Sequence, residues 1–418
     1  MEQARSNDVL ILGGGVIGLA CAWFLLKAGR GVTVLEQDRA GSGSSHGNCG
    51  TLTPSHAMPL AMPGTVGTAL RWLLRPDAPL RIKPRPDLQL LRWLLAFRRR
   101  CNWSDALRTT AAKLPLLEAS RKWIEELVRA EQLDCEFAAS GTLHVFRDPR
   151  ELERARSVHE RLAMHLPPCE VLDAAAAIAR EPALKPGLAG AILHAGDASL
   201  RPDRFVAELA RIVRAAGGRM VEGARIEKIV HDGTRIARVA TTRGEFSADE
   251  VVLALGAWSP RFARDLDLRI PIQPGKGYSI TYRRPALCPR MPLTLKERAV
   301  CVTSWESGYR LGSTMEFAGY DDTLNRTRLD ALRRGAAEYL REPEGPALVE
   351  EWFGWRPMTS DDLPLIGRVP HLRNLVLATG HGMLGVTMSV ATGVLVSEIV
   401  TARQPSLDIA AFAPARFN

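Results

Sequence analysis

Three glycines near the N-terminus have the spacing of a dinucleotide-binding turn. Gly13, Gly15 and Gly18 fit G-x-G-x-x-G and follow the apolar run 9–12. The first glycine allows a tight turn, the second lets backbone approach a pyrophosphate, and the third lets the following helix pack closely on its strand. Glu36 ends the next apolar segment, near the spacing of about 20 residues expected for an acid that accepts a ribose 2′-hydroxyl and repels a 2′-phosphate. We predict a strand–helix–strand unit that binds a dinucleotide other than NADP.

A segment of small and polar residues follows this unit. Residues 41–54 are dense in glycine, serine and threonine, and they include His46 and Asn48. Backbone N–H groups and hydroxyls of this kind can wrap closely around a ligand, whereas a solvent loop of turn-forming residues is the alternative. Because the segment directly continues the dinucleotide-binding unit, we favour ligand binding.

A second glycine-rich turn lies near the C-terminus. The apolar stretch 374–379 predicts a buried strand, and Gly380, Gly382 and Gly385 separate it from the predicted helix 386–401. Such a turn offers N–H groups to an anion or to the edge of a polar ring. Glycines needed only for packing are the alternative.

Other segments supply the elements that must position these turns. Helical spacing of apolar residues predicts helices, and apolar or alternating runs predict strands. The expected helices are 109–132, 151–165 and 203–216, and the expected strands are 141–146, 187–193, 219–229 with a hairpin to 239, 248–259, 274–281 and 308–314. The last two strands predict a second, antiparallel sheet. The length of 418 residues suffices for two domains.

Composition and charge indicate the class of protein and the compartment in which it works. The hydrophobic content of 46% and charged content of 24% are those of an ordinary soluble protein. The net charge of +9 is not concentrated in a tail. The seven cysteines form no C-x-x-C pair, which predicts a reducing compartment and no metal site. Glycines interrupt the uncharged run 9–26, and no signal peptide is evident, so we expect a cytoplasmic protein without a membrane-spanning helix.

Residues 66–103 interleave tryptophans and leucines with arginines and lysine. A basic helix with such a face can lie on an anionic membrane surface. Ordinary core helices with solvated arginines are the alternative, which we favour slightly. We expect no nucleic-acid partner because no recognised binding motif accompanies the charge. Peripheral contact of this segment with the inner face of the cell membrane stays open.

Together these motifs carry a resemblance to a known family. Residues 13–18, Glu36 and 44–50 resemble the FAD-binding N-terminus of the amine-oxidising flavoproteins, which include D-amino-acid dehydrogenases, glycine and sarcosine oxidases and proline dehydrogenase β subunits. Residues 53–64 and 69–80 are similar to the bacterial D-amino-acid dehydrogenase branch. The resemblance implies an α/β fold with interleaved domains. A Rossmann-like FAD-binding domain would comprise 1–65, 190–265 and 352–418, and an α+β substrate domain containing an antiparallel sheet would comprise 66–189 and 266–351.

The resemblance also implies which residues contact FAD. The second glycine-rich turn, which contains Gly380, His381 and Gly382 and is called the glycine-histidine turn below, would meet the flavin ring near N1 and the C2 carbonyl. The main chain near Ile226 would pack against the adenine. Sarcosine oxidases attach flavin through a cysteine, but Cys301 lacks the matching context, so we expect non-covalent FAD. The expected cofactor-binding residues are Gly13, Gly15, Val16, Ile17, Gly18, Glu36, Gln37, Ser44, Ser45, His46, Asn48, Gly50, Thr51, Leu52, Ile226, Gly256, Trp258, Gly380, His381, Gly382, Met383, Leu384, Gly385, Val386 and Thr387.

Arg356, within Gly-x-Arg-Pro, resembles the arginine that holds the substrate carboxylate in these enzymes. A guanidinium fork matches a carboxylate with two parallel hydrogen bonds, although a buried structural ion partner is the alternative. Tyr278, Tyr309 and His56 are weaker candidates for catalytic residues in the substrate pocket. Glycine oxidases place an arginine in the glycine-histidine turn, where this chain has methionine and leucine, so that second anchor is missing.

The activity implied by the resemblance is that of an FAD-dependent D-amino-acid dehydrogenase in amino-acid catabolism. Hydride would pass from the substrate Cα to flavin N5, and the imine would hydrolyse to a 2-oxo acid and ammonia. A quinone or another respiratory carrier would accept the electrons, and D-proline or hydroxy-D-proline is a plausible substrate. An oxygen-using amino-acid oxidase of the glycine or sarcosine oxidase type and a flavin-binding subunit of a multi-subunit dehydrogenase are the alternatives.

Overall fold

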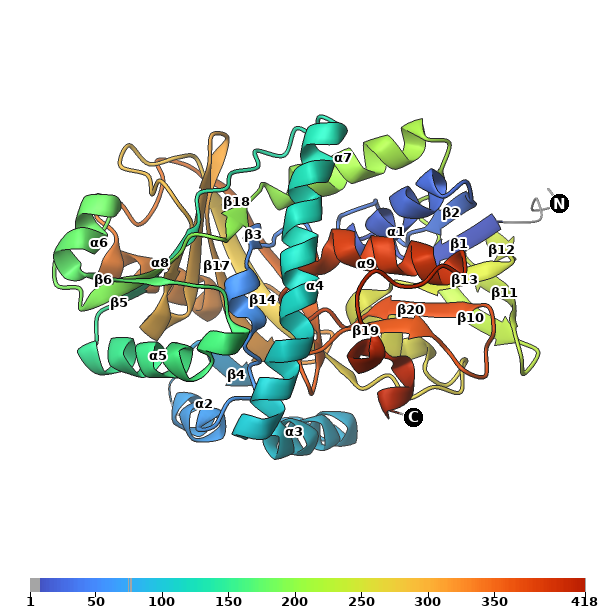
Figure 1. The fold of residues 1–418 in the computed structure, drawn as a ribbon, viewed down its shortest axis with the longest axis horizontal. Helices are drawn as coiled ribbons and strands as arrows, with labels where there is room; N and C mark the ends of the chain where they lie inside the picture. The colour runs from blue at the N-terminus through green and yellow to red at the C-terminus, as the bar shows by residue number, and fades with distance from the viewer. Residues whose placement is uncertain (1–7, 74, 76, 418) are drawn as a thin grey trace.

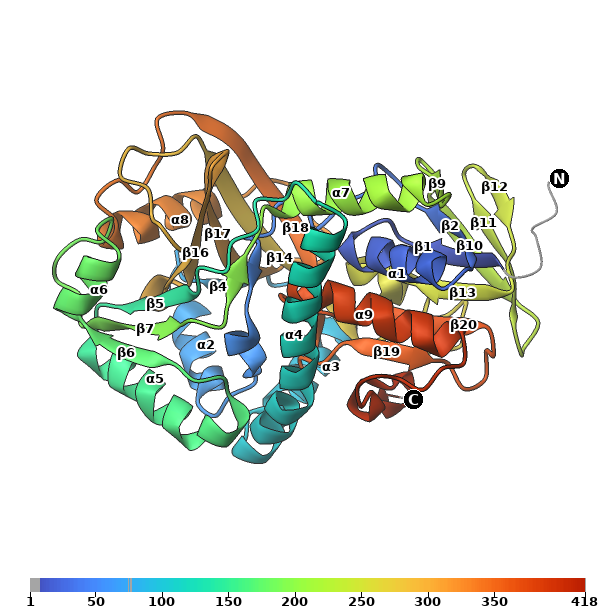
Figure 2. The same ribbon diagram turned by 45° about the horizontal axis from the view of Figure 1, so that its top comes forward.

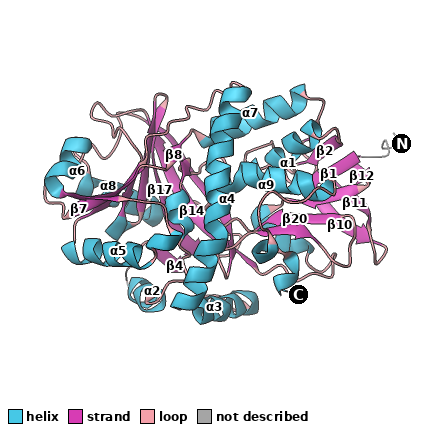
Figure 3. Cartoon of the chain, viewed as in Figure 1, coloured by secondary structure: helices cyan, strands magenta, loops and turns pink. Residues whose placement is uncertain are grey.

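The computed structural model describes residues 8–73, 75 and 77–417. Its elements form two regions side by side, and the long helix α4 (Trp103–Ala130) runs across the boundary between them (Figure 1). Each region is built on a large β-sheet with helices packed against it (Figure 3). This is the mixed α/β architecture expected from the sequence.

The sheet that carries the N-terminal glycine turn has the strand order β19–β20–β13–β1–β2–β9. Its strands are β1 (Asp8–Leu12), β2 (Gly31–Leu35), β9 (Arg219–Val221), β13 (Glu250–Leu253), β19 (Leu365–Arg368) and β20 (Leu375–Thr379). All neighbours are parallel except β19 and β20. Because β1 pairs in parallel with both β2 and β13, the carboxyl ends of these three strands lie side by side, although β13 is far from β1 in the sequence.

Both faces of this sheet are covered, which explains why its strands are apolar throughout rather than alternating. Helices α1 (Val16–Lys27), α7 (Pro202–Ala215) and α9 (Gly385–Val400) lie side by side on one face (Figure 2). There Val9 and Ile11 join the core beneath the helices. Leu10 and Leu12 join a second core, together with a meander of β10 (Ile226–His231), β11 (Ile236–Thr241) and β12 (Gly244–Phe246).

The sheet of the other region has the order β18–β14–β17–β16–β15–β5–β7–β6, with β4 paired to β17. Its strands are β4 (Leu80–Ile82), β5 (Thr142–Phe146), β6 (Glu170–Asp173), β7 (Gly190–His194), β14 (Ile272–Tyr282), β15 (Leu293–Leu295), β16 (Val300–Trp305), β17 (Gly308–Phe317) and β18 (Leu348–Thr359). It is antiparallel, as predicted, except that β15 pairs with β5 and β17 pairs with β4 in parallel.

Helices cover the outer parts of this second sheet. Leu329 and Leu332 of α8 (Arg326–Tyr339) pack in one core with Ile280 of β14 and Leu311 of β17. Helices α5 (Pro149–Arg161) and α6 (Ala174–Arg180) lie near β5, β6 and β7. The remaining short elements are β3 (Thr51–Leu52), β8 (Ala198–Ser199) and the 3₁₀ turns η1 (Pro54–Ala57), η2 (Ala163–His165), η3 (Gly256–Phe262), η4 (Lys296–Arg298), η5 (Ala410–Phe412) and η6 (Pro414–Phe417).

Two expected strands are shorter in the structure than in the prediction. The run 219–229 divides into β9 and β10, because Gly223 takes a positive φ of 69° between them and turns the chain. The run 248–259 ends as a strand at Leu253 and continues into η3, which places Gly256 and Trp258 in a turn rather than in the sheet.

The domain segments stay a prediction, but two segments assigned to the FAD-binding domain, 190–265 and 352–418, include residues of strands in the second sheet. Residues 190–194 form β7 and residues 348–359 form β18, and both strands pair within the second sheet. Helix α4, expected in the substrate domain, contributes Leu116 and Ile124 to the core that also holds α1 and α9. Apolar packing therefore joins α4 to the dinucleotide-binding side.

The basic and leucine-rich stretch forms α2 (Thr65–Leu73), β4 and α3 (Leu88–Arg100). Leu90 and Trp93 are buried against Phe317 and Met358, whereas Leu70 and Leu88 are 61% and 71% exposed. In the described part of the chain, no helix combines the length and apolar character needed to cross a bilayer.

Candidate active site

A cavity of about 1200 Å³ receives residues from both regions. On one side are the turns at the carboxyl ends of β1, β13 and β20, represented by Gly13, Ala254 and Thr379. On the other side are side chains of the second sheet, including Arg356. Ligands of open parallel sheets bind beyond the carboxyl ends of the strands, so this is the expected place for a dinucleotide.

The N-terminal turn is built as its spacing predicted. Gly13 has a φ of 108°, and a Cβ there would lie 2.6 Å from the carbonyl oxygen of Ala254. A Cβ on Gly18 would lie 1.9 Å from the carbonyl oxygen of Gly13. Only glycine fits either position, so the start of α1 packs tightly on β1. The hydroxyl of Ser45 accepts a hydrogen bond of 3.2 Å from Val16 N–H and caps the helix.

Glu36 is held by the same turn. Its carboxylate accepts hydrogen bonds from the backbone N–H groups of Gly14 at 2.7 Å and Asp38 at 3.1 Å. Burial raises the pKa of Glu36, while these two hydrogen bonds partly oppose that shift. Glu36 and Gln37 line the cavity, as expected for residues at the ribose end of a dinucleotide.

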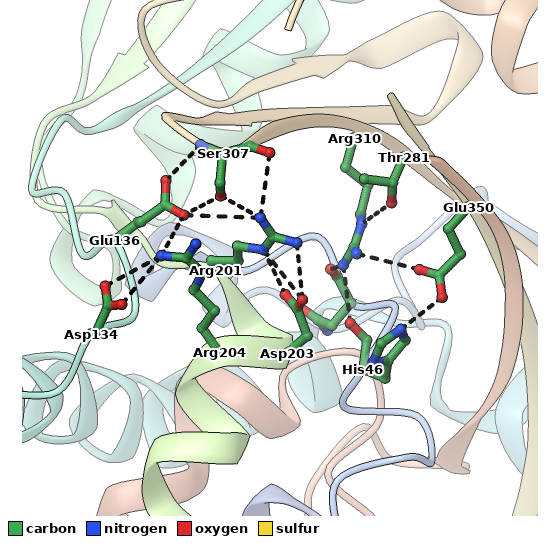
Figure 4. Close-up of polar contacts among 11 residues, drawn as sticks. His46, Asp134, Glu136, Arg201, Asp203, Arg204, Thr281, Ser307, Arg310 and Glu350 are labelled. Carbon is green, nitrogen blue, oxygen red and sulfur yellow. Dashed lines mark hydrogen bonds and ion pairs between the residues drawn. The ribbon is translucent and has the colours of Figure 1, made fainter. Parts of the chain in front are cut away.

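The loop 44–50 is fixed in place by a buried arginine. Arg310 of β17, only 1% exposed, donates to the carbonyl oxygens of His46 at 3.0 Å and Asn48 at 2.7 Å. Its Nε donates to the hydroxyl of Thr281 at 2.9 Å. His46 contacts Glu350 at 2.8 Å, and this contact is the main cause that lowers the pKa of Glu350 (Figure 4). Arg310 therefore sets the backbone path of the segment expected to wrap the cofactor.

The C-terminal glycine turn faces the cavity beside α9. Gly380 and Gly382 have φ values of 78° and 56°, and Gly382 N–H donates to the carbonyl of Pro357 at 3.1 Å. His381 contacts the hydroxyl of Thr392 at 3.0 Å, and burial lowers the pKa of His381 to about 3. Its imidazole is thus neutral at pH 7. The positive charge available to a ligand here comes from the N-terminus of α9.

Arg356 presents its guanidinium to the cavity. It stands opposite Gly275 in the pairing of β18 with β14, and its Nη1 would lie 2.2 Å from a Cβ on Gly277. Nη1 donates to the carbonyl of Thr314 at 2.8 Å. Ser313 and Thr314 have φ values of 120° and 56°, so an irregular, strained stretch of β17 aims these carbonyls at the arginine.

No carboxylate of the described residues pairs with Arg356. Burial lowers the pKa of Arg356, while the neighbouring Cys49 and Cys301 oppose that shift. An arginine remains charged in proteins despite such shifts. The guanidinium is therefore oriented by carbonyl dipoles and is available to an anionic ligand, which argues against a purely structural ion pair.

The three weaker candidates for catalytic residues differ in whether they reach the cavity. His56 lines the cavity, and burial lowers its pKa to about 3, so it is neutral at pH 7. Tyr278 also borders the cavity, but its hydroxyl donates to Glu316 at 2.5 Å and is buried, which raises its pKa. Tyr309 is fully buried and donates to the carbonyl of Pro343 at 3.1 Å. The structure does not bring Tyr309 to the cavity, because its side chain points into the core on the other face of β17.

Most of the expected cofactor-binding residues line the cavity. They are Gly13, Gly15, Val16, Ile17, Glu36, Gln37, Ser44, Ser45, Asn48, Thr51, Ile226, Gly256, Trp258, His381, Gly382, Met383, Leu384, Gly385 and Val386. The others do not line it: Gly18, His46, Gly50, Leu52, Gly380 and Thr387. Some of these support the wall. The hydroxyl of Thr387, for example, donates to the carbonyl of Thr51 at 3.2 Å and joins α9 to β3.

Several cavity residues were not among the expected site residues. Cys49 and Cys301 come together on the cavity wall, and a hydrogen bond between their thiols is the main cause that lowers the pKa of Cys49. Lys296 lines the same cavity. Arg310, which organises the loop, is an isolated charge in a strand and could have been noticed only as a cation inside an otherwise apolar run.

Comparisons with known proteins agree with this geometry. A family model described as FAD dependent oxidoreductase matches residues 8–399. The chain belongs to this family. A D-amino acid dehydrogenase of Rhizorhabdus wittichii is 36% identical over 407 residues, which cover 96% of this chain and 97% of that protein. A second D-amino acid dehydrogenase, of Paramagnetospirillum magneticum, is 36% identical over 98% of this chain and 99% of that protein.

Solved structures show the same fold. The glycine oxidase of Geobacillus kaustophilus aligns over 99% of both chains with a TM-score of 0.81 and 25% identity. The L-proline dehydrogenase of P. horikoshii aligns over 99% of this chain and 98% of that chain, with a TM-score of 0.75 and 19% identity.

This member of the FAD dependent oxidoreductase family is an enzyme whose cofactor is FAD, and the cavity fits that cofactor. The turn at Gly13 leaves room only for backbone, Glu36 lines the cavity beside it, and the N-terminus of α9 with the turn at Gly382 also lines the cavity. These groups would hold the pyrophosphate, the adenosine ribose and the polar edge of the flavin, respectively.

Proposed function

We propose that this chain is a D-amino-acid dehydrogenase that oxidises the α-carbon of its substrate and holds non-covalent FAD. The observation that carries the proposal is Arg356, a cation aimed into the FAD-binding cavity with no carboxylate partner among the described residues. A guanidinium of this kind binds an α-carboxylate with two charge-assisted hydrogen bonds. The curated relatives of Rhizorhabdus wittichii and Paramagnetospirillum magneticum support D-amino acids as the substrate class.

Arg356 would bind and orient the substrate in this mechanism. Its hydrogen bond to Thr314 fixes the guanidinium, so the α-carboxylate has one preferred position. Bound FAD supplies an acceptor for the α-hydrogen and its electron pair. The amine loses one proton as the carbon–nitrogen double bond forms, and the released imine reacts with water to give a 2-oxo acid and ammonia. Because His56 and His381 are neutral at pH 7, neither opposes binding of a cationic or neutral amine.

Anaerobic reduction of the bound flavin tests this activity directly. The purified protein is mixed with single D- or L-amino acids, and flavin absorbance is followed at about 450 nm. We expect bleaching by D-amino acids, slow return of colour in air and fast return with a soluble quinone analogue. Bleaching only by L-forms or N-methylglycine would contradict the D-preference, and fast return in air would favour the oxidase. The panel includes D-proline and hydroxy-D-proline, which stay predicted substrates. Denaturation should release the flavin if its attachment is non-covalent.

We further propose that the electron acceptor is a quinone reached from an anionic membrane surface. Five exposed leucines form a leucine face on α2 and α3: Leu70, Leu73, Leu88, Leu91 and Leu95. Exposed arginines accompany it, among them Arg71, Arg92 and Arg99. All the leucines of this face except Leu88 also line the cavity. A basic, apolar surface at the cavity mouth suits a bilayer that delivers an apolar acceptor.

A further inference from the structure

Lys296 lies on the cavity side of the second sheet, away from the expected cofactor turns. In the pairing of β15, Thr294 stands opposite Cys301 of β16 and His144 of β5. Thr294 and Cys301 both line the cavity, so this row of the sheet faces it. Lys296 follows Thr294 by two residues, begins η4 and also lines the cavity. Alternation along a strand puts residues two apart on one face, which accounts for its position.

The ammonium of Lys296 has no hydrogen-bond or ion-pair partner within the described ranges. The neighbouring carboxylate of Glu297 is already occupied. Its Oε1 accepts from the N–H groups of Arg147 and Asp148, each at 2.9 Å, and its Oε2 accepts from the hydroxyl of Tyr339. The side chain of Lys296 is exposed and borders the cavity. The protein around the cavity partly desolvates the ammonium and so lowers the pKa of Lys296, while the carboxylates of Glu297 and Glu151 oppose that shift.

The imidazoles beside Lys296 offer it no negative charge, and no carboxylate of the described residues forms an ion pair with it, although Glu297 and Glu151 lie near enough to act on it through space. His56, His144 and His194 stack edge to edge, with ring centroids 5.2 and 4.5 Å apart along the row. Burial lowers the pKa of His56 to about 3 and that of His194 to about 4, so both are neutral at pH 7. A partly desolvated cation without a counter-ion is unfavourable, and an anionic group entering the cavity would relieve that cost.

Arg356 and Lys296 are placed to hold two ends of one molecule. The guanidinium of Arg356 lies over β14 and donates to β17. Strands β16 and β15 follow in the sheet, and neighbouring strands lie about 4.8 Å apart, so the two cations are separated by roughly 10 Å across the sheet. That span suits two anionic groups on one short extended molecule, each bound through a charge-assisted hydrogen bond.

We propose that Lys296 is a specificity-determining residue that binds an acidic side chain, so that dicarboxylic D-amino acids are preferred substrates. This inference rests on the proposed function, in which Arg356 binds the α-carboxylate. The inference adds a second carboxylate to the substrate, a feature that neither the fold nor the names of the relatives specify.

The test compares acidic and neutral substrates of one shape. Anaerobic flavin reduction gives kcat/KM for D-glutamate and D-glutamine with the wild type, Lys296→Met and Lys296→Arg. The matched control is Lys228→Met, which removes an exposed lysine on β10 outside the cavity. We expect the wild type to prefer D-glutamate by about tenfold or more, the worth of one charged hydrogen bond. Lys296→Met should lose this preference, whereas Lys296→Arg and Lys228→Met should keep it.

A binding measurement that needs no turnover accompanies the kinetics. Calorimetry with the holoenzyme compares glutarate with butyrate, which differ in the second carboxylate. We expect glutarate to bind at least about tenfold more tightly to the wild type and equally weakly to Lys296→Met. Equal use of D-glutamate and D-glutamine by the wild type, or an unchanged preference in Lys296→Met, would overturn the role of Lys296. Failure of every D-amino acid to bleach the flavin would instead overturn the proposed function.

Discussion

At the scale of single residues, the site depends on charges that the chain itself leaves unpaired. The guanidinium of Arg356 donates hydrogen bonds to the backbone carbonyls of Ser313 and Thr314, in an irregular stretch of β17, rather than to a carboxylate. A protein carboxylate in that place would compete with the substrate. The neutral imidazoles of His56 and His381 have the same consequence, because they add no charge that would attract the wrong ligand.

Replacing Arg356 tests the carboxylate anchor. Arg356→Met should lower kcat/KM for D-amino acids by roughly 100-fold or more, because two charge-assisted hydrogen bonds are lost. Arg356→Lys should recover only part of the loss, since an ammonium cannot form the parallel pair. The measurement is single-turnover flavin reduction over a range of substrate concentrations. Arg334→Met, at an exposed position of α8, is the matched control. Wild-type rates in Arg356→Met with full flavin content would contradict the anchor.

At the scale of elements, distant segments are joined through buried polar contacts. Arg310 of β17 ties down the loop 44–50, and a separate polar cluster beside it joins Arg201 and Arg204 of the α7 region to Glu136 (Figure 4). The loop 44–50, which is expected to wrap the cofactor, is thus held by a strand of the other region. The shape of this loop depends on docking of the two sheets.

Arg310→Met should weaken FAD binding. The backbone carbonyls of His46 and Asn48 would lose their donor, so the loop would sample other conformations before the cofactor binds. We expect the FAD dissociation constant to rise by about tenfold or more, measured by fluorescence titration of the apoprotein. Arg204→Met removes a half-buried arginine from the neighbouring cluster, which does not contact the loop, and should change the constant little. Equal effects of the two substitutions would contradict a specific role for Arg310.

Asp197 joins η1 to β5 and should make stability depend on pH. It accepts hydrogen bonds from Ser55 at 2.6 Å and Thr142 at 2.5 Å, and burial raises its pKa from 3.8 to about 6. Between these pH values the folded chain holds a proton that the unfolded chain releases. Its contribution to the free energy of unfolding therefore falls as pH rises from about 4 to about 6, by at most about 3 kcal/mol.

Asp197→Asn removes this titration. Thermal unfolding of the holoenzyme between pH 4 and pH 7 should show the wild type losing stability relative to Asp197→Asn as pH rises. The hydroxyl of Thr142 can still donate to the amide oxygen, so the variant keeps a partner for that group. Parallel pH profiles of the two proteins would contradict the assignment.

At the scale of the whole molecule, the cavity brings the glycine turns and Arg356 together with exposed leucines of α2 and α3. Helices α2 and α3, which carry these leucines, lie at the lower edge of the molecule in Figure 1. Substrate chemistry and electron delivery would therefore use different parts of one cavity. The membrane proposal concerns the second part alone.

Vesicle flotation tests the leucine face. The protein should float with vesicles that contain anionic lipid, and less so at high salt, because arginines supply part of the attraction. The double substitution Leu70→Glu and Leu91→Glu should reduce binding at least about tenfold, since two leucines can no longer enter the interface. Met164→Glu, at a 93% exposed site on η2, is the matched control. Unchanged flotation of the double variant would contradict the surface.

The sequence alone determined the parts of this protein that are local in the chain. The turn at Gly13 and Gly18, the acid at Glu36 and the second glycine turn were predictable, because close approach of backbone permits only glycine and because strand and helix periodicity need only neighbouring residues. The α/β class followed from these units. The resemblance then named the family, which the match over residues 8–399 confirmed.

Only the tertiary structure decided which side chains share the cavity. Tyr278 and Tyr309 look like site residues in a strand pattern, but pairing of β14 with β17 buries both hydroxyls. Lys296 and Arg310 belong to no recognisable motif in the sequence, and their positions at the cavity and at the loop 44–50 arise from strand order and register over long separations. Such contacts depend on how two sheets dock, and no local periodicity encodes that arrangement.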